Sequence, residues 1–385
     1  MSDLFRQSIN KETPPRPKPT PITSTDPDDN SSSSSSADST ASINTVRPTS
    51  SEQPPPPEHW SNYFAQELYL SSSTPTSSAT YHVYLTPPTD PKKGPLFITH
   101  HGAGASGLSF ALLAQNLRHR LPEAGILSLE ARAHGSVVKS PEDDKEIPDF
   151  SITTLTADAL AMINLTVAHM TWPTLPPSIL IGHSLGGAVV TQLATDFALG
   201  TALVGYCVLD VVEGSALEAL GHMQTYLASR PSSFASVDEA VAWHTRTRTI
   251  RNAESAKVSV PGLLKPLPPS SAESKASGYT WQTNLATTTP YWPTWFTDLS
   301  PHFLTARGAK LLILAGTDRL DRELMIGQMQ GKFQLTVIPE AGHFVHEDAP
   351  EKVGEVVEGF WRRNDRGSMV LPMKVDQMLA KGMKV

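Results

Sequence analysis

The chain has 385 residues, of which 39% are hydrophobic and 18% charged, with 33 prolines and a formal net charge of −7. This length accommodates one large α/β domain with extensions. The acidic balance, without a basic stripe, argues against a nucleic-acid-binding protein. The single cysteine, Cys207, excludes an intrachain disulfide and a zinc site built from several cysteines, and its apolar neighbours favour a buried thiol.

Three ranges of the chain differ in composition. Residues 1–58 are rich in proline, serine and threonine, which is typical of a disordered leader. Residues 59–365 carry the apolar patterns of a folded domain, and residues 366–385 form a tail. No apolar run reaches the roughly 18 residues of a membrane-spanning helix, and Met1–Arg6 lacks the apolar core of a secretory signal. We therefore expect no membrane partner and a location in the cytoplasm, the nucleus or both.

Short apolar runs alternate with helical patterns along the folded part. The runs predict strands at Thr80–Leu85, Leu96–His100, Gly125–Leu129, Ser178–Ile181, Ala202–Leu209, Lys310–Ala315 and Phe333–Ile338. The helical patterns lie at Ser109–Arg120, Thr154–Met170, Leu185–Leu199 and Ala349–Arg363. Apolar strands that alternate with helices predict the α/β class, with a mostly parallel central sheet and helices on both faces.

This alternation breaks over residues 211–307. Two helical patterns, Ser215–Ala228 and Val237–Asn252, precede a Pro/Ser-rich segment at Pro261–Ser277 and an aromatic segment at Tyr279–Phe296. Nearly 100 residues between two strands of a parallel sheet are too many for a single crossover. We interpret the range as an inserted helical lid, whose tryptophans form either its core or the wall of a cleft.

The most informative motif is a G-x-S-x-G pattern centred on Ser184, between an apolar strand and an Ala/Val-rich helical pattern. A strand, a sharp turn and a helix in this order lift the serine hydroxyl clear of the sheet. Gly182 and Gly186 remove side chains that would collide across the turn. Ser184 is therefore the candidate nucleophile, and the chain is a candidate hydrolase.

A serine hydroxyl needs a general base in hydrogen-bond reach, and that base needs an orienting acid. His343 follows the last predicted strand and precedes the last helix, so it lies at the same sheet edge as Ser184. We favour it as the base over His346, three residues later.

Two positions are open for the acid. Asp210 ends the strand after the nucleophile helix, and Asp318 and Asp321 follow the next strand. Both strand ends lie at the required edge, and the spacing alone does not decide between them. Each position also has a structural interpretation, with Asp210 as a cap of the next helix and Asp318 as an ion-pair partner of a neighbouring arginine.

Ester hydrolysis also requires hydrogen-bond donors for the developing oxyanion. One is the backbone N–H of Leu185, directly after the nucleophile. The other is expected from the loop His100–Gly107, where Ala103 is our first choice of donor and Gly104 the second.

Four histidines, His100, His101, His134 and His183, lack the spacing of a metal-binding motif, and no acidic cluster joins them. We interpret the last three as packing groups of the loop and the nucleophile turn, and we expect neither a metal nor another cofactor.

Longer strings resemble the protein phosphatase methylesterase family over about residues 75–365, including the insertion. These strings are Asp210–Ala216, Arg251–Ala256, Ala315–Asp321, Ile326–Phe333 and Gly342–Pro350. The resemblance implies an α/β-hydrolase fold and a carboxylic ester hydrolase. The implied reaction removes the methyl ester from the C-terminal leucine of the type 2A protein phosphatase catalytic subunit, which would be the protein partner.

By this resemblance Ser184 is the nucleophile, His343 the base and Asp210 the acid. Asp318 would then be a structural or partner-loop residue, and it stays the alternative acid on its position after a strand. The chain departs from the family in its His101–Ser106 loop, which is poorer in glycine. It also has Leu185 where methionine is common, a volume-conserving change. Two other functions remain open, a general carboxylesterase or lipase and a non-catalytic phosphatase-binding protein.

Overall fold

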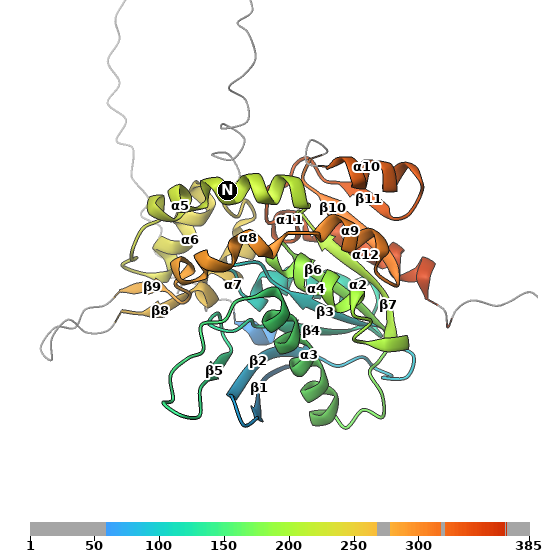
Figure 1. Cartoon of the computed structure of the whole chain (residues 1–385), viewed down its shortest axis with the longest axis horizontal. Coiled ribbons are helices and arrows are strands. Elements are labelled where there is room, and N and C mark those ends of the chain that lie inside the picture. Colours follow the sequence, from blue (N-terminus) through green and yellow to red (C-terminus); the bar gives the residue numbers. More distant parts are fainter. Residues whose placement is uncertain (1–58, 268–277, 317–319, 366, 368–385) are drawn as a thin grey trace, which may run out of the picture.

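The computed structural model describes residues 59–267, 278–316, 320–365 and 367. Within these residues a nine-stranded sheet forms the centre, in the order β1-β2-β4-β3-β6-β7-β10-β11, with β5 paired to β2 (Figure 1). β2 pairs antiparallel with β1, β4 and β5. The other neighbours are parallel. The predicted α/β class is confirmed.

The seven predicted strands are present, with ends that differ by no more than two residues. The strands of the sheet are β1 Gln66–Ser73, β2 Ser78–Thr86, β3 Leu96–His100, β4 Gly125–Leu129, β5 Val137–Lys139, β6 Ser178–His183, β7 Leu203–Leu209, β10 Ala309–Leu314 and β11 Gln334–Val337. The sequence analysis missed β1 and β5. Only Leu70 is buried in the serine-rich β1, and β5 is three residues long, so neither has an apolar run.

Helices cover both faces of the sheet. On one face lie α2 Ala111–Arg120 and α12 Pro350–Asn364. On the other lie α3 Ile152–His169, α4 Leu185–Thr195 and α9 Leu299–Thr305. Adjacent strand residues point to opposite faces, so in β6 Ile179 packs with the first group and Leu180 with the second.

Two helices end earlier than the sequence pattern predicts. α4 ends at Thr195 rather than Leu199, and α6, Val237–Arg246, stops short of Asn252. Phe197 and Arg248 adopt φ values of 52° and 56°. A left-handed residue ends the helical hydrogen-bond ladder, so each helix stops before it.

Apart from α9, which covers a face of the sheet, the chain between β7 and β10 lies largely to one side of it (Figure 1). It contains α5 Glu213–Ser229, α6, α7 Ala253–Ser259, α8 Trp292–Trp295, α9 and the hairpin β8 Leu264–Pro266 with β9 Tyr279–Trp281. Part of it has a small hydrophobic core of its own, built from Phe234, Ala240, Ile250, Ala256 and Val260. The other helices are α10 Arg322–Met329 and α11 Val345–Asp348. The predicted leader and most of the Pro/Ser-rich segment and tail lie outside the described residues.

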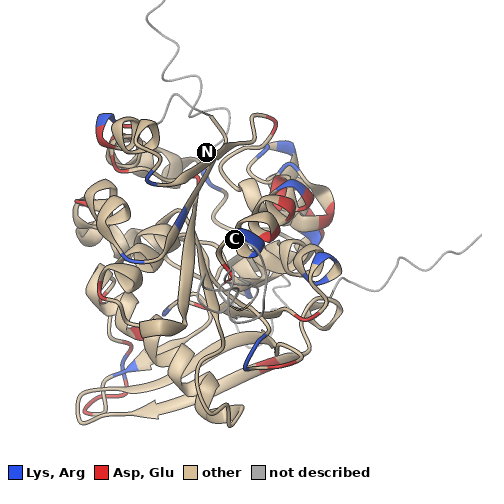
Figure 2. Cartoon of the chain, turned by 90° about the vertical axis from the view of Figure 1, so that its right-hand side faces the viewer, with Lys and Arg blue, Asp and Glu red and all other residues tan. Residues whose placement is uncertain are grey.

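Charged residues lie on the helices, the loops and some strands away from the centre of the sheet (Figure 2). The central strands β3, β4, β6 and β7 contain none. Cys207 is fully buried in β7, as expected. Over the described ranges, no helix combines the length and the apolar character needed to cross a membrane.

Candidate active site

Ser184 occupies the turn between β6 and α4 with φ of 52° and ψ of −119°, a conformation that is costly for a residue with a side chain. Close backbone packing holds this turn. A Cβ atom added at Gly182 would overlap the carbonyl of Gly186, and one added at Gly186 would overlap the carbonyl of His100. The Ser184 N–H donates to the Leu209 carbonyl at 3.1 Å. The strained turn expected from the glycine spacing is therefore present.

His343 and Asp210 meet at the carboxyl edge of the sheet. His343 Nδ1 lies 2.9 Å from Asp210 Oδ2, and the carboxylate is fully buried. The other oxygen, Oδ1, accepts the backbone N–H of Ala315 at 2.8 Å. The His343 carbonyl accepts a hydrogen bond from Nε2 of His183 at 2.9 Å. Asp210 is thus held by the backbone N–H of Ala315, and His343 is held through both its ring and its backbone carbonyl.

The structure does not place Asp210 in the structural role that it had as an alternative. The N-cap of α5 is Val212, without a side-chain cap, so Asp210 does not cap this helix. Asp321 caps α10 instead, because its Oδ1 accepts the N–H of Leu324 at 2.9 Å. Asp318, the alternative acid, lies outside the described residues.

Ser184, Asp210 and His343 line one cavity, together with Ala103 and Leu185. The three predicted catalytic residues and the two predicted oxyanion donors are therefore brought together. Leu185 is the first residue of α4, so its backbone N–H has no carbonyl acceptor within the helix. A Cβ atom added at Gly102 would lie 3.0 Å from the Ser184 Cβ, so the loop that carries Ala103 runs against the nucleophile.

Gly104 is not available as the second choice of donor. Its N–H donates to His134 Nε2 at 2.8 Å. Its φ of 74° turns the loop away from the extended conformation. Ala103 remains the donor that we infer from this loop.

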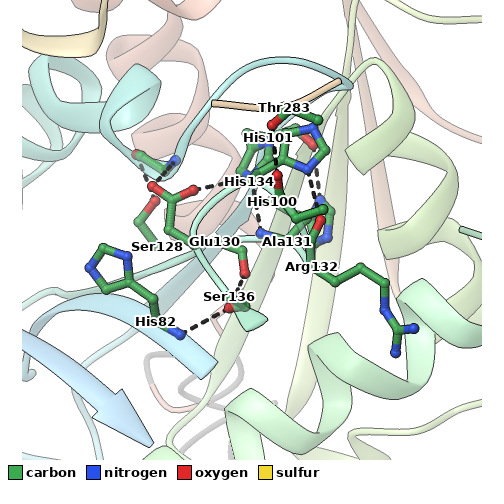
Figure 3. A network of polar contacts seen from close by, with 12 residues as sticks. His82, His100, His101, Ser128, Glu130, Ala131, Arg132, His134, Ser136 and Thr283 are labelled. Atoms are coloured by element: carbon green, nitrogen blue, oxygen red, sulfur yellow. Dashed lines mark hydrogen bonds and ion pairs between the residues drawn. The ribbon is translucent and has the colours of Figure 1, made fainter. Parts of the chain in front are cut away.

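Buried histidines hold the oxyanion loop in place (Figure 3). His101 Nδ1 lies 2.8 Å from the Gly102 carbonyl, and its Nε2 accepts the N–H of Ala131 at 3.0 Å. His134 Nδ1 lies 2.9 Å from the Arg132 carbonyl. In each ring one nitrogen must donate and the other accepts, which requires the neutral form. The prediction that these histidines pack the loop is confirmed, although they act through hydrogen bonds and not through packing alone.

The sequence analysis missed the groups behind these histidines. Glu130, directly after β4, accepts the Gly107 N–H at 2.7 Å, and burial raises the pKa of its carboxyl to about 7. Arg132 forms a buried ion pair with Asp158, at 2.5 and 2.9 Å. The position of both residues after a strand was the available signal. Their contacts lie 23 and 26 residues away in the chain, so no local pattern could reveal them.

His346 is not positioned as a base. It is fully buried, its ring stacks on Phe110 with centroids 4.4 Å apart, and burial lowers its pKa to about 3. Its two ring nitrogens have no hydrogen-bond partner among the described residues. In the same part of the chain, no group of three or more His, Cys, Asp or Glu side chains is arranged to hold a metal ion.

The insertion supplies the apolar wall of the cavity. Its lining side chains include Leu220 and Met223 of α5 and the aromatic residues Trp281, Trp292 and Trp295. Trp292 and Trp295 are also buried in the core that packs on α3 and α4. The two interpretations of the lid tryptophans are therefore compatible, since the same rings form core and cavity wall.

Comparison with known proteins agrees with this geometry. Residues 96–356 match the sequence profile described as the alpha/beta hydrolase family. The peroxisomal α/β-hydrolase Lpx1 from Saccharomyces cerevisiae superposes with a TM-score of 0.58 at 16% identity, over 82% of this chain and 94% of that one. E-2-(acetamidomethylene)succinate hydrolase superposes with a TM-score of 0.55 at 18% identity, over 77% of this chain and 100% of that one. At these identities the likeness concerns the fold alone. The chain belongs to the α/β-hydrolase family.

The curated relatives of this chain narrow the family further. Protein phosphatase methylesterase 1 of Neurospora crassa is 52% identical over 86% of this chain and 80% of its own length. The protein of the same name from Aspergillus fumigatus is 55% identical over 83% of this chain and 76% of its own length. The one from Schizosaccharomyces pombe is 42% identical over 82% of this chain and 87% of its own length. Within the α/β-hydrolases, the chain is a member of the protein phosphatase methylesterase family. It is a carboxylic ester hydrolase.

Gly182→Ala should destabilise the protein and abolish ester hydrolysis. The added methyl overlaps the Gly186 carbonyl, and overpacking against backbone costs about 2–4 kcal/mol. The matched control is Gly221→Ala in α5, where an added Cβ meets nothing within 4 Å. That variant should gain about 0.5–1 kcal/mol, because alanine has the higher helix propensity. Urea unfolding and p-nitrophenyl acetate hydrolysis measure both effects, and equal stabilities would contradict the close-packed turn.

Asp210→Asn should lower kcat by roughly a thousandfold or more while the protein stays folded. An amide at this position leaves the His343 imidazole in the wrong tautomer and does not stabilise its protonated form. Asp318→Asn is the control and should retain the parent rate. Steady-state hydrolysis of a nitrophenyl ester distinguishes the two acids, and the reverse pattern would assign the role to Asp318.

The contribution of His101 and His134 to stability should fall as the pH drops from about 6.5 toward 4. Burial lowers the pKa of His101 and of His134 to about 4, so the unfolded chain binds protons in this window that the folded chain does not. His134→Gln should therefore reduce the slope of unfolding free energy against pH by up to about 1.4 kcal/mol per pH unit. Urea unfolding at several pH values measures the slope. The control is His222→Gln at an exposed position of α5, which should leave the slope as in the parent chain.

Proposed function

We propose that this chain is a serine hydrolase that removes the methyl ester from the C-terminal leucine of the type 2A protein phosphatase catalytic subunit. The observation that supports it most strongly is the Ser184, His343 and Asp210 arrangement in a member of the methylesterase family. The partner is accordingly a protein, and its C-terminal segment enters the cavity. We propose a location in the cytoplasm, the nucleus or both.

The first half of the mechanism forms an acyl-enzyme. His343 takes the proton of the Ser184 hydroxyl as its oxygen attacks the ester carbonyl, while Asp210 stabilises the resulting imidazolium. The N–H groups of Ala103 and Leu185 donate to the oxyanion of the tetrahedral intermediate. The intermediate collapses, the bond to the methoxy group breaks, and His343 protonates the leaving methanol.

The second half regenerates the enzyme. Water gives a proton to His343 and attacks the acyl carbon, and the same two N–H groups bind the oxyanion again. The Ser184 oxygen leaves and recovers its proton from His343. The product is a free C-terminal carboxylic acid, which ionises at neutral pH.

Affinity for such a substrate must come from the part that is not the methyl group, because one methyl buries very little surface. The cavity wall fits this requirement. Leu220, Met223 and Trp292 form an apolar surface that suits a leucine side chain close to the nucleophile. A general carboxylesterase would show no preference for a methyl-esterified protein over a small ester.

Ser184→Ala should reduce methanol release from the carboxymethylated phosphatase to the uncatalysed level, because the nucleophile is removed. Phosphatase affinity should stay at the parent value, since the cavity walls are unchanged. Methanol release and calorimetric binding are the two measurements. Ser232→Ala, at an exposed position of the insertion, is the matched control and should match the parent in both. A parent chain that hydrolyses p-nitrophenyl acetate but not the methylated phosphatase would refute the proposed substrate.

A further inference from the structure

A second polar group in the cavity is not used by the proposed chemistry. Arg230, the residue directly after α5, lines the same cavity as Ser184. It is the single lysine or arginine among the described residues of that lining. Its Nε atom is buried without a hydrogen-bond partner in the described part of the chain, and its guanidinium forms no ion pair there.

This situation differs from that of two other arginines in the protein interior. Arg132 is bound by both oxygens of Asp158, and Arg251 lies 3.7 Å from Asp348. Burial lowers the pKa of Arg230, yet a guanidinium keeps its charge at neutral pH. A partly buried cation without an anionic partner is costly, and a bound carboxylate would remove that cost.

The Arg230 side chain is held in place by the aromatic ring on which it stacks. Its Cζ atom lies 3.5 Å from the ring centroid of Trp281. The Trp281 Nε1–H donates to the Pro231 carbonyl at 2.7 Å, which ties the ring to the residue after Arg230. Phe234 and Trp243 pack edge-on against the same ring, with centroids 5.3 and 5.9 Å away. A guanidinium stacked on an aromatic face keeps its N–H edges free for a planar acceptor.

Neither acid among the described residues of the cavity lining competes for this cation. Asp210 is bound to His343 and Ala315. Glu347 accepts hydrogen bonds from Ser255 and Ser259 at 2.8 and 2.6 Å, and burial raises the pKa of its carboxyl to about 8. An anion at Arg230 must therefore come from outside the described chain.

Arg230 also lies far along the cavity from the start of α5. α5 begins three residues after Asp210, and Ser215 and Arg230, both in the cavity lining, lie at its two ends. At 1.5 Å per residue the helix separates them by roughly 20 Å. An extended peptide covers this distance in about six residues, so a substrate segment of that length along α5 would reach from Ser215 to Arg230.

We propose that Arg230 binds the carboxylate of an acidic side chain in the substrate segment that precedes the methyl-esterified leucine. This inference rests on the proposed function, since it concerns a peptide that extends from Ser184 along α5. Arg230 then selects for an acidic C-terminal segment, while the apolar wall accepts the leucine. It is a specificity residue and takes no part in the chemical step.

The test uses peptides that end in leucine methyl ester, with aspartate placed in turn at each of the six preceding positions and asparagine as the uncharged match. The full chain should prefer aspartate about tenfold or more in kcat/KM at one position, as expected for charge-assisted hydrogen bonds. Arg230→Gln should abolish this preference through KM, with kcat unchanged. Arg230→Lys should retain part of it. All three proteins should hydrolyse p-nitrophenyl acetate equally, which checks the fold and the triad.

Calorimetric binding of the same peptides as free acids needs no turnover and separates the two proposals. If no methyl ester is hydrolysed but the aspartate peptide binds more tightly in an Arg230-dependent way, the proposed function fails and the Arg230 site stands. If the esters are hydrolysed with the same aspartate preference in Arg230→Gln, or with none in the parent chain, the Arg230 site is refuted and the function stands. If the parent chain shows neither ester hydrolysis nor aspartate-dependent binding, both proposals are refuted.

Discussion

The site depends on a contact between backbone and backbone. The turn at Ser184 exists because Gly182, Gly186 and the end of β3 approach one another so closely that no side chain fits between them. The left-handed φ of Ser184 is tolerated only because the parallel pairing of β6 with β3 and β7 holds both sides of the turn. The same pairing brings the end of β3, which begins the oxyanion loop, next to the nucleophile. One steric constraint therefore positions both the attacking oxygen and one of its oxyanion donors.

Around this turn, polar groups are arranged so that each reactive part has a buried support. Asp210 is bound by the N–H that follows β10, and the loop of Ala103 is held by His101 and His134. These supports are neutral or paired, so they add little net charge to the cavity. Buried polar networks of this kind specify one geometry when every member is satisfied. Their cost appears in acid, where the neutral histidines take up protons only if the loop opens.

Much of this arrangement was predictable from the sequence, for reasons that differ between residues. Ser184 and His343 stand in local patterns, a glycine-flanked turn and a loop between the last strand and helix, so their neighbours along the chain identify them. The acid was ambiguous, because Asp210 and Asp318 follow equivalent strand ends, and only the resemblance favoured Asp210. Glu130, Arg132 and Arg230 were missed because their contacts join distant segments. Backbone hydrogen bonding to His134 could likewise not be read from the loop, so Gly104 remained a candidate donor until the fold was known.

The insertion packs partly around Phe234, Ala240 and Ile250, a core separate from those of the sheet. This part of the insertion has an interior of its own, whereas Trp292 and Trp295 share the core of the sheet. Substitutions around Phe234 and Ile250 can therefore reshape this part of the insertion without repacking the strands of the sheet. Such a division lets one hydrolytic scaffold diverge toward new targets by drift in a single segment. It also suggests where to graft a foreign recognition element onto this enzyme.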